Sequence, residues 1–182
     1  KYRGAAPIHY AILNGETETG VTVFQIEPKL DAGPILAVET SPIGPKETTG
    51  EVESRLSQLS GPLTLQVING LETGTLEPIL QDASGVTLAP TMRKSFGQID
   101  WTKPTAAILC HLRAMQPWPT PFTFLNQSNQ PPLRLIILDA DPSASEETNP
   151  ETLSPGTVSF VDDERFSVST ADGAITIRKI RP

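Results

Sequence analysis

Asp31 is the side chain of this sequence best placed to do chemistry. It lies in the stretch EPKLDAGPIL, residues 27–36, at a Gly-Pro turn between two apolar runs. A carboxylate in such a connection can accept and relay a proton, and connections are common positions for catalytic groups. An aspartate beside a glycine also commonly caps a turn through its own side chain. The residues of this stretch alone leave both interpretations open.

Few other side chains could act as metal ligands or nucleophiles. His9 and His111 are the only histidines, and Cys110 is the only cysteine. One thiol excludes an internal disulfide framework and a multi-thiolate metal site, and two histidines are too few for a histidine-based one. We therefore expect no metal. We expect these three residues to lie on the surface of a helix or to pack beside one.

Five basic residues are candidates for substrate binding through phosphate groups, because guanidinium and ammonium groups bind phosphate oxygens. They are Lys1, Arg3, Arg93, Lys94 and Arg113. The alternative for each is a solvated position or an ion pair within the protein. The net charge of −7 argues against non-specific nucleic-acid binding. Basic and acidic residues number 5 and 11 up to Pro90 but 9 and 10 after it, so the second part suits a polyanion better.

Two strands are predicted to hold Asp31 between them. The runs at 19–26 and 34–43 are β-branched and alternate or continue in apolar residues, which is typical of strands. The residues between these runs are then the strand connection that carries Asp31.

The helices predicted around these strands are short. Apolar residues at mostly helical spacing predict a helix between Ala6 and Gly15. Three- and four-residue steps from Val52 to Val67 predict helical structure, which SGP at 60–62 should divide into two helices. Residues 1–74 therefore form an α/β piece with too few strands to close a doubly wound sheet, and we expect further sequence before Lys1.

A linker and a second unit are predicted after this piece. Residues 75–98 carry turn residues and no clear period, which indicates a linker. Residues 99–182 begin with a helix from Pro104 to Met115, whose apolar face contains Ile108 and Leu112.

Five short strands separated by turns predict a small antiparallel barrel of the oligonucleotide/oligosaccharide-binding (OB) type for this second unit. The strand candidates are FTFL at 122–125, PLRLIILD at 132–139, GTVSFV at 156–161, RFSVST at 165–170 and AITIRKI at 174–180. ADG at 171–173 predicts a tight hairpin turn, and the polar insert at 139–156 predicts a long mobile loop. The fold class expected is thus α/β followed by a small OB-like β-barrel.

Several motifs occur in one order along the chain. They are KYRGAAP at 1–7, TGVTVFQIEPKLDAGPIL at 19–36, GQIDW at 97–101, LRAMQPWP at 112–119 and PGTVSF at 155–160. This series closely resembles the methionyl-tRNA formyltransferase family, from within its catalytic domain almost to its C-terminal end. LDAGP alone also resembles folate-dependent formyltransferases that act on glycinamide ribonucleotide or amino sugars, but the series as a whole is specific.

The resemblance implies transfer of a formyl group from 10-formyltetrahydrofolate to the amino group of methionyl-initiator tRNA, in translation initiation. It also implies a Rossmann-like catalytic domain, an OB-like barrel after a linker, and a monomer. The family's catalytic groups are an asparagine, a histidine and the aspartate of the LDxG loop, which is Asp31 here. The asparagine and histidine precede RGAAP in the family, so neither His9 nor His111 replaces them. We therefore expect residues 1–182 alone to be inactive.

Two departures from the family weaken the prediction of tRNA binding by this chain alone. Position 91 is threonine where the family usually has lysine, and the sequence stops at IRKIRP, before the basic tail that often follows. Two alternatives stay open: an amino-sugar or nucleotide formyltransferase with the same folate donor, and a non-catalytic nucleic-acid-binding module.

The expected location is the cytoplasm, without a membrane partner. No apolar run reaches the roughly 18 residues of a membrane helix. No charged-then-apolar leader opens the chain.

Overall fold

A β-hairpin with one long helix beside it dominates the first of the two units of the chain. The computed structural model describes residues 1–143 and 153–182. The first unit consists of Lys1–Ile12 and Glu16–Met92, and the second of Leu13–Gly15 and Arg93–Pro182. No helix in the described ranges is long and apolar enough to cross a membrane.

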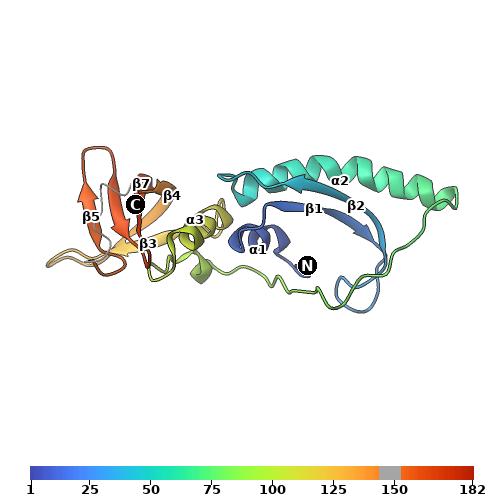
Figure 1. The fold of residues 1–182 in the computed structure, drawn as a ribbon, viewed down its shortest axis with the longest axis horizontal. Helices are drawn as coiled ribbons and strands as arrows, with labels where there is room; N and C mark the ends of the chain where they lie inside the picture. Colours follow the sequence, from blue (N-terminus) through green and yellow to red (C-terminus); the bar gives the residue numbers. More distant parts are fainter. Residues whose placement is uncertain (144–152) are drawn as a thin grey trace. The chain divides into compact units, whose positions relative to one another are not determined.

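The elements of the first unit follow the predicted order. They are α1 (Pro7–Leu13), β1 (Glu18–Phe24), β2 (Ile35–Pro42) and α2 (Thr49–Glu72). The two strands pair in antiparallel register from Glu18 opposite Pro42 to Phe24 opposite Ile35, and α2 runs along this hairpin (Figure 1). Both predicted strands and the connection between them are confirmed, so Asp31 does lie in a strand connection.

The predicted break between two helices at 60–62 is wrong, because α2 is one helix of 24 residues with Pro62 inside it. Proline lacks the N–H that would bind the carbonyl of Gln58 and costs a helix about 3 kcal/mol. The buried face of α2 continues across this point through Leu56, Leu63 and Val67. Burial of each such side chain contributes about 1.5–3 kcal/mol, which outweighs the cost of an exposed proline.

The segment 75–92 lies along the first unit. It makes two isolated bridges, one between Ile79 and Ile35 and one between Leu88 and Arg3. Backbone hydrogen bonds join Arg3 N–H to the Thr87 carbonyl at 2.8 Å and Ala89 N–H to the Arg3 carbonyl at 2.7 Å. The segment is therefore tied both to the start of β2 and to the first residues of the chain.

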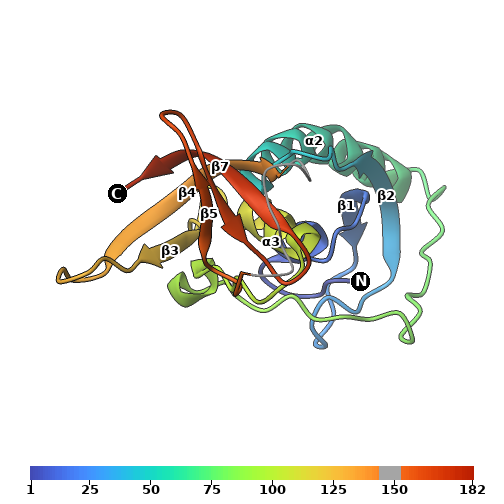
Figure 2. The same ribbon diagram turned by 60° about the vertical axis from the view of Figure 1, so that its left-hand side comes forward.

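The second unit is a curled antiparallel sheet with a helix packed on it (Figure 2). Its elements are η1 (Lys94–Gly97), α3 (Thr105–Ala114), β3 (Phe122–Leu125), β4 (Leu133–Pro142), β5 (Val158–Val161), β6 (Phe166–Ser169) and β7 (Ala174–Arg181). The strand order is β3-β4-β7-β6-β5. All five predicted strands and the helix are confirmed, as is the hairpin at 171–173, which joins β6 to β7. The predicted long loop at 139–156 is wrong at its start, because residues 139–142 belong to β4, and its middle, residues 144–152, lies outside the described residues.

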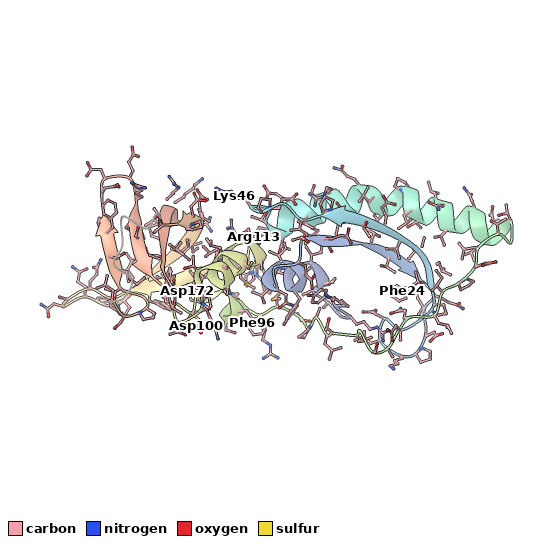
Figure 3. The ribbon with its side chains drawn as sticks, in the orientation of Figure 1. Phe24, Lys46, Phe96, Asp100, Arg113 and Asp172 are labelled. Carbon is pink, nitrogen blue, oxygen red and sulfur yellow. The ribbon has the colours of Figure 1, made fainter. Side chains whose placement is uncertain are left out.

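Helix α3 is fixed on this sheet at its face and at its N-terminus. Ile108 and Leu112 pack into an apolar cluster with Ile137 and other strand residues. At the N-terminus, Asp172 Oδ1 of the β6–β7 turn accepts the Thr105 N–H at 2.7 Å, and this bond lowers the pKa of Asp172 (labelled in Figure 3). Pro104, which precedes the helix, provides no side-chain cap. Asp172, 67 positions after Thr105, caps the helix instead.

Candidate active site

The connection between β1 and β2 holds Asp31 in an uncommon backbone conformation. Its φ of 45° lies in the left-handed region, which costs a non-glycine residue about 1–3 kcal/mol. Two residues later, a Cβ on Gly33 would lie 1.7 Å from the Gln25 carbonyl oxygen, so only glycine fits there. The connection is therefore tightly folded, and its shape needs support from outside.

The carboxylate of Asp31 is held through one oxygen only. Oδ2 accepts the backbone N–H of Gly4 at 2.8 Å. Among the described residues, no hydrogen bond or ion pair is recorded for Oδ1. Gly4 itself has a φ of 130°, and a Cβ there would lie 2.5 Å from the Ala89 carbonyl oxygen. The fixed oxygen orients the group and leaves the other available for chemistry.

The side chain of Gln81 holds the backbone of the same connection. Its Nε2 donates to the Asp31 carbonyl at 3.0 Å and to the Gly33 carbonyl at 2.6 Å. Its Oε1 accepts from Arg3 Nη2 at 2.7 Å. Asp31 is therefore held by Gly4 at its side chain and by Gln81 at its backbone.

A cavity of about 550 Å³ opens beside Asp31. Its lining comes from the first four residues, from both strands and from Gln81, with apolar side chains such as Phe24, Ile35 and Val38 (Phe24 is labelled in Figure 3). Small-molecule sites commonly have about 300–1,000 Å³ and mix apolar walls with a few polar groups. This cavity has both properties, so its size and lining suit a small-molecule ligand.

Lys1, Tyr2 and Glu16 form a polar cluster on the same cavity. Glu16 Oε1 accepts the Tyr2 hydroxyl at 2.7 Å and the Lys1 ammonium at 2.9 Å. The Tyr2 bond and then the Lys1 bond lower the pKa of Glu16, and the bond to Glu16 raises the pKa of Lys1. This cluster is charged and paired, whereas Oδ1 of Asp31 is open.

The candidate substrate-binding residues divide between the two units. Lys1 and Arg3 line the cavity with Asp31, although Arg3 is 8% exposed and engaged by Gln81. Arg93 and Lys94 are exposed where η1 begins in the second unit. Arg113 is half-buried on α3, where its Nη2 donates to Cys110 Sγ at 3.3 Å (Arg113 is labelled in Figure 3). Their roles toward a substrate stay predictions.

His9, His111 and Cys110 are not among the residues that line the cavity beside Asp31. His9 is on α1, and half-buried His111 on α3 places Nε2 3.4 Å from the Gly97 carbonyl oxygen. Burial lowers the pKa of His111. In the described ranges no three His, Cys, Asp or Glu side chains are grouped so that they could hold a metal ion.

An aromatic and basic surface lies on the second unit, at the β3 edge of the sheet. Phe122 and Phe124 share one face of β3, and the register places Arg134 opposite Phe124 and Arg181 in line with them on β7. The two rings meet edge to face at 5.8 Å, and the Arg134 guanidinium lies 4.2 Å from the centre of the Phe122 ring. Phe124 is 45% exposed. We name these four residues the Phe124 face.

Sequence reasoning missed two groups at the cavity. Gln81 lies in the segment interpreted as a linker, where no periodicity or motif marked it. Gly4 is part of the quoted RGAAP motif, and its glycine could have indicated a close backbone approach.

Both parts of the chain match family models. The model described as formyl transferase matches residues 1–68, and the model described as formyl transferase, C-terminal domain, matches residues 91–182. The chain belongs to the formyl transferase family. Asp31 and its cavity thus lie in the part that matches the first model, and the Phe124 face in the part that matches the second.

Relatives that cover the whole chain are named methionyl-tRNA formyltransferases. One from Rhodopirellula baltica is 39% identical over 192 residues, which cover 100% of this chain and 55% of the relative. One from Nitratidesulfovibrio vulgaris (strain DP4) is 34% identical over 182 residues, which cover 100% and 54%. This formyl transferase chain therefore spans about half the length of the curated relatives it matches.

Solved structures with the same fold include an N-formyltransferase and HypX. An N-formyltransferase from Helicobacter canadensis, in complex with folinic acid and dTDP-3-aminofucose, aligns with a TM-score of 0.74 at 20% identity and covers 100% of this chain and 62% of that one. HypX from Aquifex aeolicus, in complex with tetrahydrofolic acid, aligns with a TM-score of 0.68 at 23% identity, and the alignment covers 98% of this chain and 30% of that one. These likenesses show the fold alone: a mixed α/β unit with a curled five-stranded antiparallel sheet.

Proposed function

We propose that the protein containing this chain transfers a formyl group from 10-formyltetrahydrofolate to the amino group of methionyl-initiator tRNA. The observation that carries the proposal is Asp31, which lines the cavity with Oδ2 fixed by Gly4 and Oδ1 open. The names of the relatives at 34% and 39% identity support the tRNA acceptor. Residues 1–182 are proposed to be inactive alone, because the family's catalytic asparagine and histidine lie upstream.

The geometry suits proton transfer at Asp31. When an amine forms a bond to a formyl carbon, its nitrogen becomes positive and must lose a proton. Asp31 Oδ1 is the acceptor, while Oδ2 stays bound to Gly4 N–H and keeps the carboxylate oriented. The folate supplies the formyl group and, in its leaving nitrogen, the final destination of the proton. Donors for the developing oxyanion are expected from the upstream asparagine and histidine.

An RNA acceptor is favoured over an amino sugar by the Phe124 face. Exposed aromatic rings beside guanidinium groups stack on unpaired bases and bind phosphates. A sugar nucleotide needs no such surface on a second unit. The amino-sugar alternative rests on the fold shared with the Helicobacter canadensis enzyme, and a non-catalytic nucleic-acid-binding module is the third candidate.

The wider architecture is part of this proposal. Residues 1–74 are the C-terminal part of a Rossmann-like formyltransferase domain, 75–98 a linker, and 99–182 an OB-like domain. The protein is a cytoplasmic monomer that binds folate and initiator tRNA without a metal ion or a membrane.

The test is a formylation assay on the full-length protein with methionyl-tRNA and 10-formyltetrahydrofolate. Asp31→Asn should lower kcat by about 10²- to 10⁴-fold, the usual contribution of a general acid-base group. Asp82→Asn removes the same charge from an exposed turn where the Asp82 carboxylate accepts hydrogen bonds from Ser84, and should leave turnover unchanged. Equal activity of the two variants would refute the role of Asp31.

Two further arms test the acceptor and the inactivity of the chain alone. A dTDP-linked amino sugar supplied in place of methionyl-tRNA should not be formylated, and its preferential formylation would establish the sugar alternative. Formylation by residues 1–182 alone would contradict the proposed need for the upstream residues.

A further inference from the structure

Gln81 reaches the Asp31 connection from 50 positions further along the chain. We propose that Gln81 is a positioning residue: its amide fixes the connection so that Asp31 Oδ1 stays at the cavity in the geometry for proton transfer. The inference rests on the proposed function, since it assigns Gln81 a role through Asp31. It makes a residue of the segment 75–98 part of the site.

The hydrogen-bonding capacity of the Gln81 amide allows one orientation. Nε2 carries two hydrogens, and both have a carbonyl acceptor, on Asp31 and on Gly33. Oε1 accepts from Arg3. A reversed amide would place its oxygen against two carbonyl oxygens and its hydrogens against a guanidinium. The side chain is therefore specific for this arrangement of the connection.

The connection has no equivalent support elsewhere in the described residues. Gln81 donates to both carbonyls, that of the left-handed Asp31 and that of Gly33 two residues later. The connection's other hydrogen bonds among the described residues are Gly4 N–H to Asp31 Oδ2, Ala32 N–H to the Lys29 carbonyl at 3.3 Å and Gln25 N–H to the Pro34 carbonyl. Loss of Gln81 would leave two carbonyls without donors and free the backbone that carries the carboxylate.

Arg3 makes the amide rigid. Its guanidinium is buried and donates to Gln81 Oε1, and its backbone is bound to Thr87 and Ala89 of the same segment. Gly4, the next residue, holds Oδ2 of Asp31. Arg3 therefore links the two supports of Asp31, one at its side chain and one at its backbone.

The test uses Gln81→Glu in the full-length protein. Glutamate keeps the size of glutamine and an oxygen for Arg3, but it turns the double donor into an acceptor facing two carbonyl oxygens. Displacement of a catalytic group by about 1 Å can cost about 10²-fold in rate, so kcat should fall about 10- to 100-fold. KM for either substrate should change less than kcat does, because Gln81 lines the cavity but its amide is engaged by the connection and by Arg3. Gln58→Glu, on the exposed face of α2, adds the same charge and should change neither constant.

Two readouts separate positioning from a general loss of structure. In an Asp31→Asn background, Gln81→Glu should cause no further fall in kcat, because Gln81 acts through the missing carboxylate. Hydrogen exchange should accelerate in residues 27–33 and stay unchanged in α2. Gln81→Met, which removes both donors without adding charge, serves for the same measurements if the glutamate variant folds poorly.

The outcomes distinguish this inference from the proposed function. Unchanged kcat in both Gln81 variants, or an equal loss with and without Asp31, would overturn the positioning role and leave the function standing. An Asp31→Asn variant with full turnover would instead overturn the function, and exchange in 27–33 would still show whether Gln81 fixes the connection.

Discussion

At the scale of single residues, Gly4 and Gly61 differ in how much space surrounds the position of a Cβ atom. Gly4 has a φ of 130° and would place a Cβ 2.5 Å from the Ala89 carbonyl oxygen, whereas a Cβ at Gly61 of α2 would meet no other part of the described chain within 4 Å, apart from its chain neighbours and the nearby helix backbone. Gly4→Ala should lower the free energy of unfolding by about 2 kcal/mol or more, through strain and collision. Gly61→Ala should change it little, because the helix propensity gained with alanine is offset by the clash of its Cβ with the Cδ of Pro62, the next residue. Denaturant unfolding of the full-length variants measures both, and a neutral Gly4→Ala would contradict the tight approach.

Asp31 could be found from sequence and Gln81 could not, for a physical reason. Asp31 follows an alternating strand pattern and stands in a Gly-Pro turn, so its neighbours in sequence define its surroundings. The partners of Gln81 are two backbone carbonyls and Arg3, 78 positions away, and no local pattern encodes such contacts. Arg3 is a case in which residue type alone misleads. Its guanidinium suggested phosphate binding, but Arg3 is buried and donates to Gln81.

At the scale of elements, the cap that Asp172 provides for α3 predicts a pH-dependent stability. The bond from Thr105 N–H lowers the pKa of Asp172, so the folded state binds its proton less readily than the unfolded state. The stabilisation is present above the unfolded pKa of about 3.9 and disappears as pH falls through the folded value. Asp172→Ala should therefore lower Tm by a few degrees at pH 7 and by progressively less below about pH 4.

Asp163→Ala is the matched control for this cap, because Asp163 is an exposed aspartate in the turn between β5 and β6. Its substitution should leave Tm nearly unchanged at both pH values. A Tm difference for Asp172→Ala that stayed constant down to pH 2.5, roughly a unit or more below an ordinary carboxyl pKa, would contradict an ionised cap.

The elements themselves were largely predictable, and the exception is instructive. The strands carry alternating or continuous β-branched runs bounded by turns, which is a local signal. Pro62 is also a local signal, one that predicts a helix break. The helix continues because Leu56, Leu63 and Val67 are buried along one face of α2. A prediction from local propensity fails where tertiary packing contributes more free energy than that propensity does.

At the scale of the whole molecule, the chain has few positive charges to bind the phosphates of the proposed tRNA acceptor. The net charge is −7, so the basic side chains that contact RNA phosphates must be few and located at specific positions. Arg134 on the Phe124 face should be one of them, and Arg134→Ala in the full-length protein should weaken tRNA binding and reduce the salt slope of log K by about 1. Phe124→Ala should weaken binding about tenfold through lost stacking, with the slope unchanged.

The sheet offers its own control at its other edge. Arg165 lies 5.7 Å from the centre of the Phe160 ring, which makes a similar pair, but Asp162 binds Arg165, and Asp163 and Glu164 adjoin it. Arg165→Ala should leave tRNA affinity unchanged. Equal effects of Arg134→Ala and Arg165→Ala, measured by fluorescence anisotropy at several salt concentrations, would contradict a role for the Phe124 face.

The contact between Gln81 and Arg3 also sets an order of events during synthesis. A ribosome adds about 5–20 residues per second, so the Asp31 connection leaves it seconds before Gln81 and Thr87 do. The connection must wait for those residues, because Gln81 supplies the donor for its carbonyls and Thr87 supplies an acceptor for the Arg3 backbone. Nascent chains stalled before Gln81 should thus carry a hairpin whose connection is still cut by protease, and protection should appear once the tunnel has released Ala89.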